Sequence, residues 1–258
     1  MTAIGLAEIV AGHRARVAAD RRSFEAELEI ARNSPSPRDF AGALGDDKIS
    51  LIAEVKRRSP SRGDLAPHLE PGPLAKAYVA GGASAVSVLT DENFFGGSWA
   101  DLHEARSACG VPVLRKDFTL SPLDVCDVRS KGADAVLLIA AVLEDGLLAE
   151  LVALAAELGL VALVETHTEG EIDRALAAGA TVVGINQRDL GDFTVDPERA
   201  ARLASAVPAG CVRVAESGVR SPEDVRRAAA AGFDAVLVGE QLVTAADPEA
   251  EARRLVGG

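Results

Sequence analysis

The sequence predicts an α/β protein, a closed (β/α)8 TIM barrel with an N-terminal helical extension. The main observation is a repeat in which a glycine closes a helix, a short turn follows, and small and branched apolar residues form a buried strand. This pattern occurs at 81–90, 131–140, 178–187 and 231–240. Its glycine stands at positions 82, 132, 179 and 232, and the steps of 50, 47 and 53 residues are about twice the length of one strand–helix unit. A second strand is therefore expected in each interval.

The intervals contain these second strands. Apolar segments occur at 111–118, 160–167 and 211–218, and a first strand at 50–56 precedes the repeats. Helices are expected between the strands, at 70–81, 98–108, 121–131, 143–158, 168–178, 196–206, 220–231 and about 240–256. Eight such units indicate a closed parallel barrel. The alternative, an open doubly wound sheet, usually carries a glycine-rich fingerprint after its first strand, and this sequence has none.

The residues before the first strand predict a helical extension. Between positions 4 and 32, apolar residues recur at three- and four-residue steps, and the proline-containing stretch 33–37 would end this helical region. We expect residues 1–47 to pack on the barrel as an N-terminal extension. We expect residues 1–258 to form a single domain, because this length suits one barrel.

The composition narrows the class of function. A formal net charge of −12 argues against a nucleic-acid partner, because phosphate backbones attract basic surfaces. Three cysteines without a C-x-x-C pair are typical of reduced thiols in a cytoplasmic protein. No apolar run reaches the roughly 18 residues of a membrane span, and the histidines are too scattered along the chain to suggest a metal set. We therefore expect a cytoplasmic protein with no membrane partner, no metal and no cofactor.

Polar side chains follow the predicted strands at their carboxyl ends, where barrels of this kind place their active sites. The first strand ends in Glu54 and Lys56, which strand alternation places on one face. Later strands end in Lys116 with Asp117, Glu165, Asn186 with Arg188, Glu216-Ser217-Gly218, and Gly239. One such end could simply be a strand that reaches solvent. Five strand ends with polar side chains, all except the one at Gly239, indicate a shared polar site, since buried charges are costly unless they pair in a pocket.

These residue types favour acid–base chemistry on a small phosphorylated anion. Gly218 and Gly239, with Glu240 opening the last helix, resemble a phosphate cradle in which backbone N–H groups meet the anion. A lysine whose pKa is lowered by burial and neighbouring cations could act as a general acid. The arginine- and serine-rich loop 57–63 is a candidate lid, with an ordinary solvated connection as the alternative.

Eight motifs, in this order, resemble the indole-3-glycerol-phosphate synthase family of tryptophan biosynthesis: IAEVKRRSPSRG, SVLTDENFFGGS, LRKDF, ADAVLLIAA, ALVETH, GINQRDL, VAESGV and DAVLVGEQLV. The similarity spans nearly the whole chain, including the N-terminal helical extension that this family carries. It implies a carboxy-lyase that acts on 1-(2-carboxyphenylamino)-1-deoxyribulose 5-phosphate. Such an enzyme joins the arene carbon to the sugar carbonyl carbon and releases CO2 and water, leaving indole-3-glycerol phosphate.

The resemblance also implies roles for the residues at matching positions. Lys116 would be the general acid at the ketone oxygen, and Glu165 would take part in proton removal for the dehydration. Lys56 would hold the substrate carboxylate and assist as an acid, while Glu54 and Asn186 would orient lysine and hydroxyl groups. The remaining substrate contacts would come from Ser59, Arg188, Glu216 and Ser217, the phosphate site from Gly218, Gly239 and Glu240, and an apolar wall for the arene from Phe118, Leu138 and Leu190.

Three stretches depart from the family pattern, namely 91–93, 119–124 and Gln187, and they bear on efficiency or substrate tolerance rather than on the reaction class. Two alternatives remain: another phosphate-binding barrel enzyme, such as a phosphoribosyl isomerase, and a non-catalytic barrel that binds a metabolite. The set of Lys56, Lys116 and Glu165 disfavours both, because isomerases of this kind use Asp or Cys and a binding protein needs no acid–base pair. We expect a monomer, and association with other tryptophan-pathway enzymes stays open.

Overall fold

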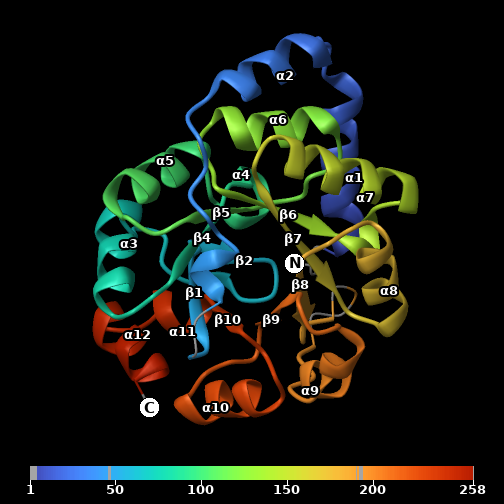
Figure 1. Cartoon of the computed structure of the whole chain (residues 1–258). Coiled ribbons are helices and arrows are strands. Elements are labelled where there is room, and N and C mark those ends of the chain that lie inside the picture. The colour runs from blue at the N-terminus through green and yellow to red at the C-terminus, as the bar shows by residue number, and fades with distance from the viewer. Residues whose placement is uncertain (1–4, 46–47, 190, 192–193, 258) are drawn as a thin grey trace.

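The computed structural model describes residues 5–45, 48–189, 191 and 194–257. Its centre is a closed barrel of eight parallel strands, in the spatial order β1-β10-β9-β8-β7-β6-β5-β4, with β4 paired back to β1 (Figure 1). The strands are β1 (Ser50–Val55), β4 (Ala85–Leu89), β5 (Val113–Lys116), β6 (Ala135–Ile139), β7 (Val161–Thr166), β8 (Val182–Asn186), β9 (Val212–Glu216) and β10 (Ala235–Val238). The predicted (β/α)8 barrel is confirmed.

Helices surround the barrel. They are α3 (Pro71–Ala80), α5 (Trp99–Ala108), α6 (Pro122–Ser130), α7 (Asp145–Glu157), α8 (Glu169–Ala177), α9 (Arg199–Leu203), α10 (Pro222–Ala230) and α12 (Pro248–Val256), with the short helices α4 (Glu92–Phe95) and α11 (Glu240–Val243) in loops. Single-turn 3-10 segments lie at Gly42–Leu44, Ala140–Val142 and Ala204–Ala206. Within the described parts of the chain, none of the helices combines the length and apolar character that crossing a bilayer demands.

Two expected helices are interrupted. The helix expected at about 240–256 is divided into α11 and α12, because Asp247 caps α12 and Pro248 begins it. The helix expected at 196–206 is reduced to α9 followed by a 3-10 turn. The N-terminal helical region is likewise divided into α1 (Leu6–Ala19) and α2 (Phe24–Asn33), where Ser23 caps α2 by accepting a hydrogen bond from the Ala26 N–H.

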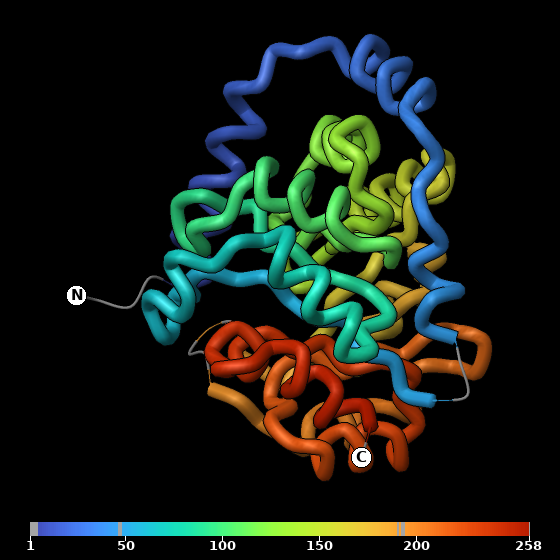
Figure 2. Tube along the Cα trace, turned by 90° about the vertical axis from the view of Figure 1, so that its left-hand side faces the viewer, coloured from blue at the N-terminus to red at the C-terminus, as the bar shows by residue number. Residues whose placement is uncertain are grey.

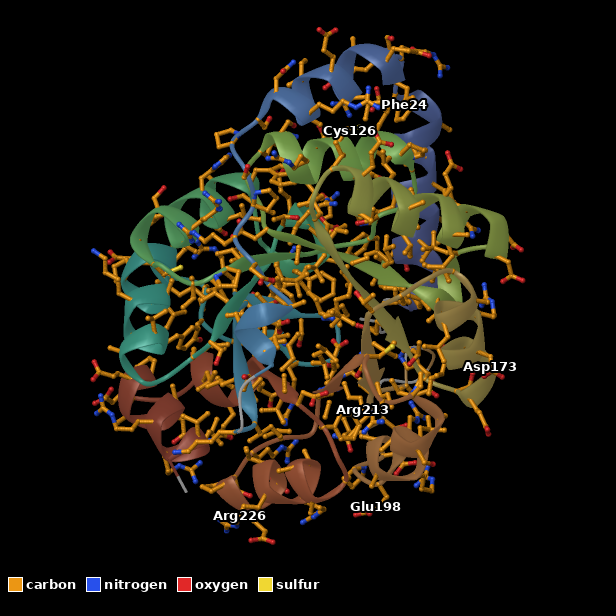
Figure 3. The ribbon with its side chains drawn as sticks, in the orientation of Figure 1. Phe24, Cys126, Asp173, Glu198, Arg213 and Arg226 are labelled. Atoms are coloured by element: carbon orange, nitrogen blue, oxygen red, sulfur yellow. The ribbon has the colours of Figure 1, made fainter. Side chains whose placement is uncertain are left out.

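The extension runs along the barrel from one end to the other (Figure 2). α1 lies at the carboxyl ends of the strands, where Arg14 donates to the Val142 carbonyl and Arg16 pairs with Asp124. α2 packs on α6, and Phe24 and Cys126 lie at this seam (Figure 3). At the opposite end, the buried Asp134 accepts hydrogen bonds from the Arg38 backbone N–H and the Arg106 side chain.

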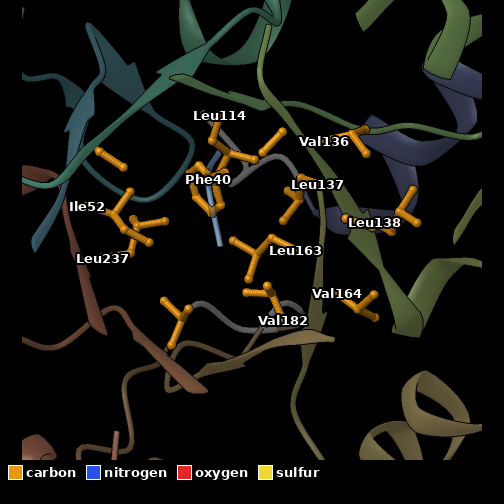
Figure 4. Packing of buried hydrophobic residues seen from close by; sticks show 14 of the residues in the cluster. Phe40, Ile52, Leu114, Val136, Leu137, Leu138, Leu163, Val164, Val182 and Leu237 are labelled. Carbon is orange, nitrogen blue, oxygen red and sulfur yellow. The ribbon is translucent and has the colours of Figure 1, made fainter. Parts of the chain in front are cut away.

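The barrel interior is apolar at the amino end of the strands. Inward side chains such as Ile52, Leu114, Leu163 and Leu237 are at most 5% exposed. Phe40, from the segment between α2 and β1, belongs to the same core cluster and is fully buried. In Figure 4 its ring lies over the centre of the barrel. A closed apolar bottom leaves the carboxyl ends of the strands as the place where polar groups can gather.

Candidate active site

An open pocket lies at the carboxyl ends of the strands. Of the fifteen residues predicted for the site, thirteen line this pocket: Glu54, Lys56, Ser59, Lys116, Phe118, Glu165, Asn186, Arg188, Glu216, Ser217, Gly218, Gly239 and Glu240. They come from β1, β5, β7, β8, β9 and β10 and from the loops that follow these strands. Residues far apart in the sequence therefore line one opening at the carboxyl ends of the strands, which we call the mouth of the barrel.

β1 places an ion pair on the pocket side of the barrel. Alternation along β1 and just beyond it sends both Glu54 and Lys56 inward, and Lys56 Nζ lies 2.7 Å from Glu54 Oε1. The backbone of Gly239 approaches this pair closely, since a Cβ at position 239 would lie 2.4 Å from Glu54 Oε1. Glycine at this position leaves the room that the Glu54–Lys56 pair occupies.

A second buried cluster joins three other strands. Lys116 Nζ at the end of β5 lies 2.6 Å from Glu165 Oε2 on β7 and 2.7 Å from Glu216 Oε2 on β9. Gly184 on β8 makes room between the two glutamates, because a Cβ there would lie 2.1 Å from Glu216 Oε1. One ammonium group therefore bridges two carboxylates.

This cluster fixes the protonation states. Burial alone would lower the pKa of Lys116, but Glu165 and Glu216 outweigh it and raise that pKa above its ordinary value. Burial opposes ionisation of Glu165, yet Lys116 and His167 hold its pKa below the ordinary value. Burial and the adjacent Glu165 charge raise the pKa of Glu216 to about 7, against the pull of Lys116. The pocket thus presents an ammonium group, a carboxylate and a carboxyl group that titrates near neutral pH.

The expectation of a lysine with a lowered pKa is wrong for Lys116. That expectation assumed neighbouring cations, whereas the charges next to Lys116 Nζ are the carboxylates of Glu165 and Glu216. Strand order is the cause, because β5, β7 and β9 all send their last inward residue to the same point.

The other side of the mouth is cationic. Arg188 and Arg220 line the pocket beside Gly218 and Gly239. Burial, together with the charges of Arg62 and Arg220, lowers the pKa of Arg188 below its ordinary value. A concentration of guanidinium groups next to glycine backbone suits a multiply charged anion such as a phosphate.

Ser217 and Gly218 form a strained turn in this cationic region. Both have left-handed backbones, with φ of 64° and 78°, and Ser217 is the one described non-glycine residue with positive φ. Gln187 holds the turn by donating from Nε2 to the Ser217 carbonyl at 2.7 Å. A strained non-glycine residue in a pocket wall commonly marks a functional position. Gln187, a departure from the family pattern, thus braces this turn.

The loop after β1 folds back over the mouth. It contains a short hairpin of β2 (Arg58–Ser59) and β3 (Gly63–Asp64), where a plain loop was expected. Ser59, Pro60 and Ser61 line the pocket. Arg62 Nη2 lies 2.8 Å from Glu240 Oε1 of α11, so the hairpin is tied to the far rim.

Two predicted site residues are not part of the described pocket. Leu138 does not line it, whereas its neighbours Leu137 and Ile139 do. Alternation along β6 turns Leu138 to the outer face of the barrel, as Figure 4 shows. The expectation that Leu138 forms the arene wall is therefore corrected to Leu137 and Ile139. Leu190 lies outside the described residues.

Two residues of this region were not predicted as site residues, Asp91 after β4 and His13 of α1, whereas Asp117 was expected at the carboxyl end of its strand. Asp91 and Asp117 line the pocket, and His13 of α1 is buried against them. One possible ligand atom from each of these three side chains lies within 4.8 Å of the others. His13 and Asp91 are 78 positions apart, so spacing along the chain could not reveal this contact. A direct hydrogen bond between these two residues already accounts for their proximity.

The chain is similar to proteins of known family along nearly its whole length. The family profile described as indole-3-glycerol phosphate synthase matches residues 6–255. An indole-3-glycerol phosphate synthase of Mycolicibacterium vanbaalenii is 49% identical over 253 residues, which cover 97% of this chain and 93% of that protein. An indole-3-glycerol phosphate synthase 2 of Streptomyces coelicolor is 52% identical over 234 residues, covering 90% and 91%.

Solved structures resemble the barrel at low sequence identity. A thiamine phosphate pyrophosphorylase from Pyrococcus furiosus matches with a TM-score of 0.60 and 17% identity, over 81% of this chain and 94% of that one. An N-acetylmannosamine-6-phosphate 2-epimerase from Clostridium perfringens matches with a TM-score of 0.61 and 19% identity, over 81% and 93%. These likenesses support the fold alone.

Proposed function

The chain belongs to the indole-3-glycerol phosphate synthase family, and from this premise we propose how its own residues carry out the reaction. The enzyme is a carboxy-lyase that converts 1-(2-carboxyphenylamino)-1-deoxyribulose 5-phosphate into indole-3-glycerol phosphate, CO2 and water. Carbon–carbon bond formation requires a proton donor at the ketone oxygen, and dehydration requires a base. The protein must therefore hold an acid and a base within reach of one substrate.

Lys116 is the proposed general acid. Its ammonium group is buried at the end of β5, and its raised pKa keeps it protonated at neutral pH. Glu165, 2.6 Å away, is the proposed base, because its lowered pKa keeps it ionised and able to accept a proton. Glu216 touches the same ammonium group at 2.7 Å and can hold a proton near neutral pH. It is proposed to contact the substrate and to exchange protons with Lys116.

Lys56 is proposed to bind the substrate carboxylate until CO2 leaves. Glu54, at 2.7 Å, fixes the position of the Lys56 ammonium group. Asn186 orients the central cluster, since a hydrogen bond from its side chain helps to hold the pKa of Glu165 down. Phe118, Leu137 and Ile139 form the apolar wall that suits a flat arene.

The phosphate is proposed to lie at the cationic side of the mouth. Gly218 and Gly239 allow close approach of the backbone, and Glu240 begins α11 there. Ser217 and Arg188 would contact the phosphate-bearing half of the substrate. Ser59 and the rest of the loop 57–63 would close over the bound substrate and exclude water.

The observation that carries these roles is the placement of one buried ammonium group between two carboxylates, within a pocket that also has an apolar wall and a cationic end. The test is incubation with the carboxyphenylamino substrate while indole fluorescence is followed. Wild-type protein should form the product, and Lys116→Ala should not. An undiminished signal from Lys116→Ala would defeat the proposed acid.

We further propose that residues 1–258 act as one domain, with residues 1–47 as an extension of the barrel, and that the enzyme is a cytoplasmic monomer. The reaction itself does not require association with other enzymes of tryptophan biosynthesis. Size-exclusion chromatography with light scattering tests the monomer directly.

A further inference from the structure

The N-terminal extension contacts the active site through one side chain. His13 lies near the middle of α1, is 6% exposed and reaches the loops that follow β4 and β5. Neighbouring α1 residues Ile9 and Val10 are also buried, so the helix is fixed against the barrel at this point. His13 is therefore a buried polar group at the boundary between the extension and the pocket.

His13 makes two kinds of contact. Its Nε2 lies 2.9 Å from Asp91 Oδ2, within hydrogen-bond distance, and 3.7 Å from Asp117 Oδ1. Its ring lies against that of Phe118, with the centroids 5.1 Å apart and the planes inclined at 39°. Each of these three partners lines the active-site pocket.

One of the three hydrogen bonds to the Asp91 carboxylate comes from His13. Asp91 Oδ1 accepts from the backbone N–H groups of Phe94 and Phe95 at the start of α4, while Oδ2 faces His13. The carboxylate is 5% exposed. Removing its side-chain donor would leave a buried charged oxygen without compensation and favour a shift of the loop that carries it.

Asp117 and Phe118 directly follow the proposed acid Lys116. Asp117 Oδ2 accepts from Thr90 and Arg115, and its Oδ1 accepts from the Phe118 N–H at 2.7 Å. The Phe118 ring is thus held on its backbone side by Asp117 and at its ring by His13. A helix outside the barrel completes the support of this wall.

We propose that His13 is a positioning residue for the reaction, which fixes Phe118 and the Asp91 loop so that the apolar wall is ready for the substrate arene. This inference rests on the proposed function, since it assigns Phe118 to the arene. It makes α1 a working part of the active site rather than a covering of the barrel.

Three substitutions separate the two contacts. His13→Phe keeps an aromatic ring against Phe118 and removes the donor to Asp91. His13→Asn removes the ring and shortens the reach. His13→Gln places an amide nitrogen near the position of Nε2 and should restore the hydrogen bond. The matched control is His103→Phe, the same change at an exposed histidine of α5.

The readouts are kcat and KM for the substrate, the inhibition constant of inorganic phosphate, and a thermal melt. We expect KM to rise about tenfold in His13→Phe and His13→Asn with kcat changed less than about threefold, since the wall acts in binding. His13→Gln keeps the hydrogen bond but lacks the ring against Phe118, so its KM should lie between those of wild type and His13→Asn, about threefold above wild type. The inhibition constant of inorganic phosphate should stay unchanged, because Gly218 and Gly239 belong to loops other than those that His13 contacts.

The outcomes are distinct. An unchanged KM in His13→Phe, or in His13→Asn if the former does not fold, overturns the inference. An equal weakening of phosphate inhibition also overturns it, since that result means general loosening of the barrel. A wild-type protein that forms no indole product defeats the proposed function instead. A selective rise in KM that His103→Phe does not share supports His13 as a positioning residue.

Discussion

Lys116 Nζ lies 2.6 Å from Glu165 Oε2, so the proposed acid and the proposed base form a buried ion pair before substrate arrives. Each residue sets the charge of the other, because Glu165 helps to raise the pKa of Lys116 and Lys116 helps to lower that of Glu165. The substrate must therefore bind next to Lys116 and Glu165 while these two side chains are already paired with each other. Replacing either residue therefore removes a catalytic group and changes the protonation of its partner.

Lys116→Ala should lower kcat by about a thousandfold, since general acid catalysis contributes factors of this order. KM and the inhibition constant of phosphate should change much less, because the cationic side of the mouth does not contact Lys116. Steady-state kinetics with indole fluorescence measures both. A rise in KM at unchanged kcat would show that Lys116 only binds the substrate.

Glu165→Gln should lower kcat by about a hundredfold or more, because the amide has nearly the shape of the carboxylate but cannot accept the proton. Glu223→Gln is the matched control, as Glu223 is an exposed residue of α10 paired with Arg226. The control should keep wild-type kinetics. A Glu165→Gln enzyme with wild-type kcat would remove Glu165 from the role of base.

Glu216 should make the protein less stable as pH rises. Its pKa is raised from 4.5 to about 7 in the folded state, so between these values the folded protein holds a proton that the unfolded chain has lost. The unfolded state then binds fewer protons, and the free energy of unfolding falls with rising pH by on the order of 3 kcal/mol across this window. Glu216→Gln should remove that decline.

Urea unfolding at about pH 5 and pH 7, for wild type and Glu216→Gln, measures this effect as a difference between the two proteins. The difference is needed because the raised pKa of His167 gives a separate loss of stability above its ordinary value of 6.5. Glu165 does not change the free energy of unfolding between pH 5 and pH 7, because its lowered pKa places its titration below 4.5. Parallel pH profiles for the two proteins would contradict the raised pKa of Glu216.

The barrel was predictable because each strand and each helix carries a local pattern. The glycines that close helices and the apolar runs that follow them recur along the chain, and alternation correctly placed Glu54 and Lys56 on one face. On β6 the same alternation turns Leu137 and Ile139 toward the pocket and Leu138 away from it, contrary to the expectation for Leu138. The prediction for β6 was therefore wrong by one residue along the strand.

Contacts between distant elements could not be predicted in this way. The bond of His13 to Asp91 depends on where α1 crosses the barrel, and no periodicity within α1 specifies this position. The raised pKa of Lys116 depends on β7 and β9 sending carboxylates to the point where β5 ends. Such properties arise from the closed barrel as a whole, so the sequence indicates the residue types but not their mutual distances.

Gly239→Ala should impair catalysis without unfolding the protein. The new Cβ would lie 2.4 Å from Glu54 Oε1 and 3.1 Å from Lys56 Nζ, so the pair must move. We expect kcat/KM to fall at least about tenfold, in line with the cost of overpacking a filled site. Gly146→Ala is the control, because a Cβ at this exposed position of α7 meets nothing within 4 Å. Equal kinetics for both variants would show that the Glu54–Lys56 geometry is not critical.

Arg62→Ala tests whether the hairpin after β1 acts as a lid. The Arg62–Glu240 ion pair joins the hairpin to α11 across the mouth, but the two side chains are 53% and 30% exposed. An exposed pair contributes little to folding, so the free energy of unfolding should change by less than about 0.5 kcal/mol. KM should nevertheless rise about threefold to tenfold, because a lid that docks less often holds the substrate less well.

Salt provides a second readout of the same contact. Screening by about 1 M salt weakens exposed ion pairs, so the difference in KM between wild type and Arg62→Ala should shrink there. Arg226→Ala is the matched control, since Arg226 is 55% exposed, close to the 53% of Arg62, and pairs with Glu223 on α10, outside the pocket. It should leave KM unchanged at either salt concentration. If Arg62→Ala also left KM unchanged at low salt, closure of the hairpin would not depend on its contact with Glu240.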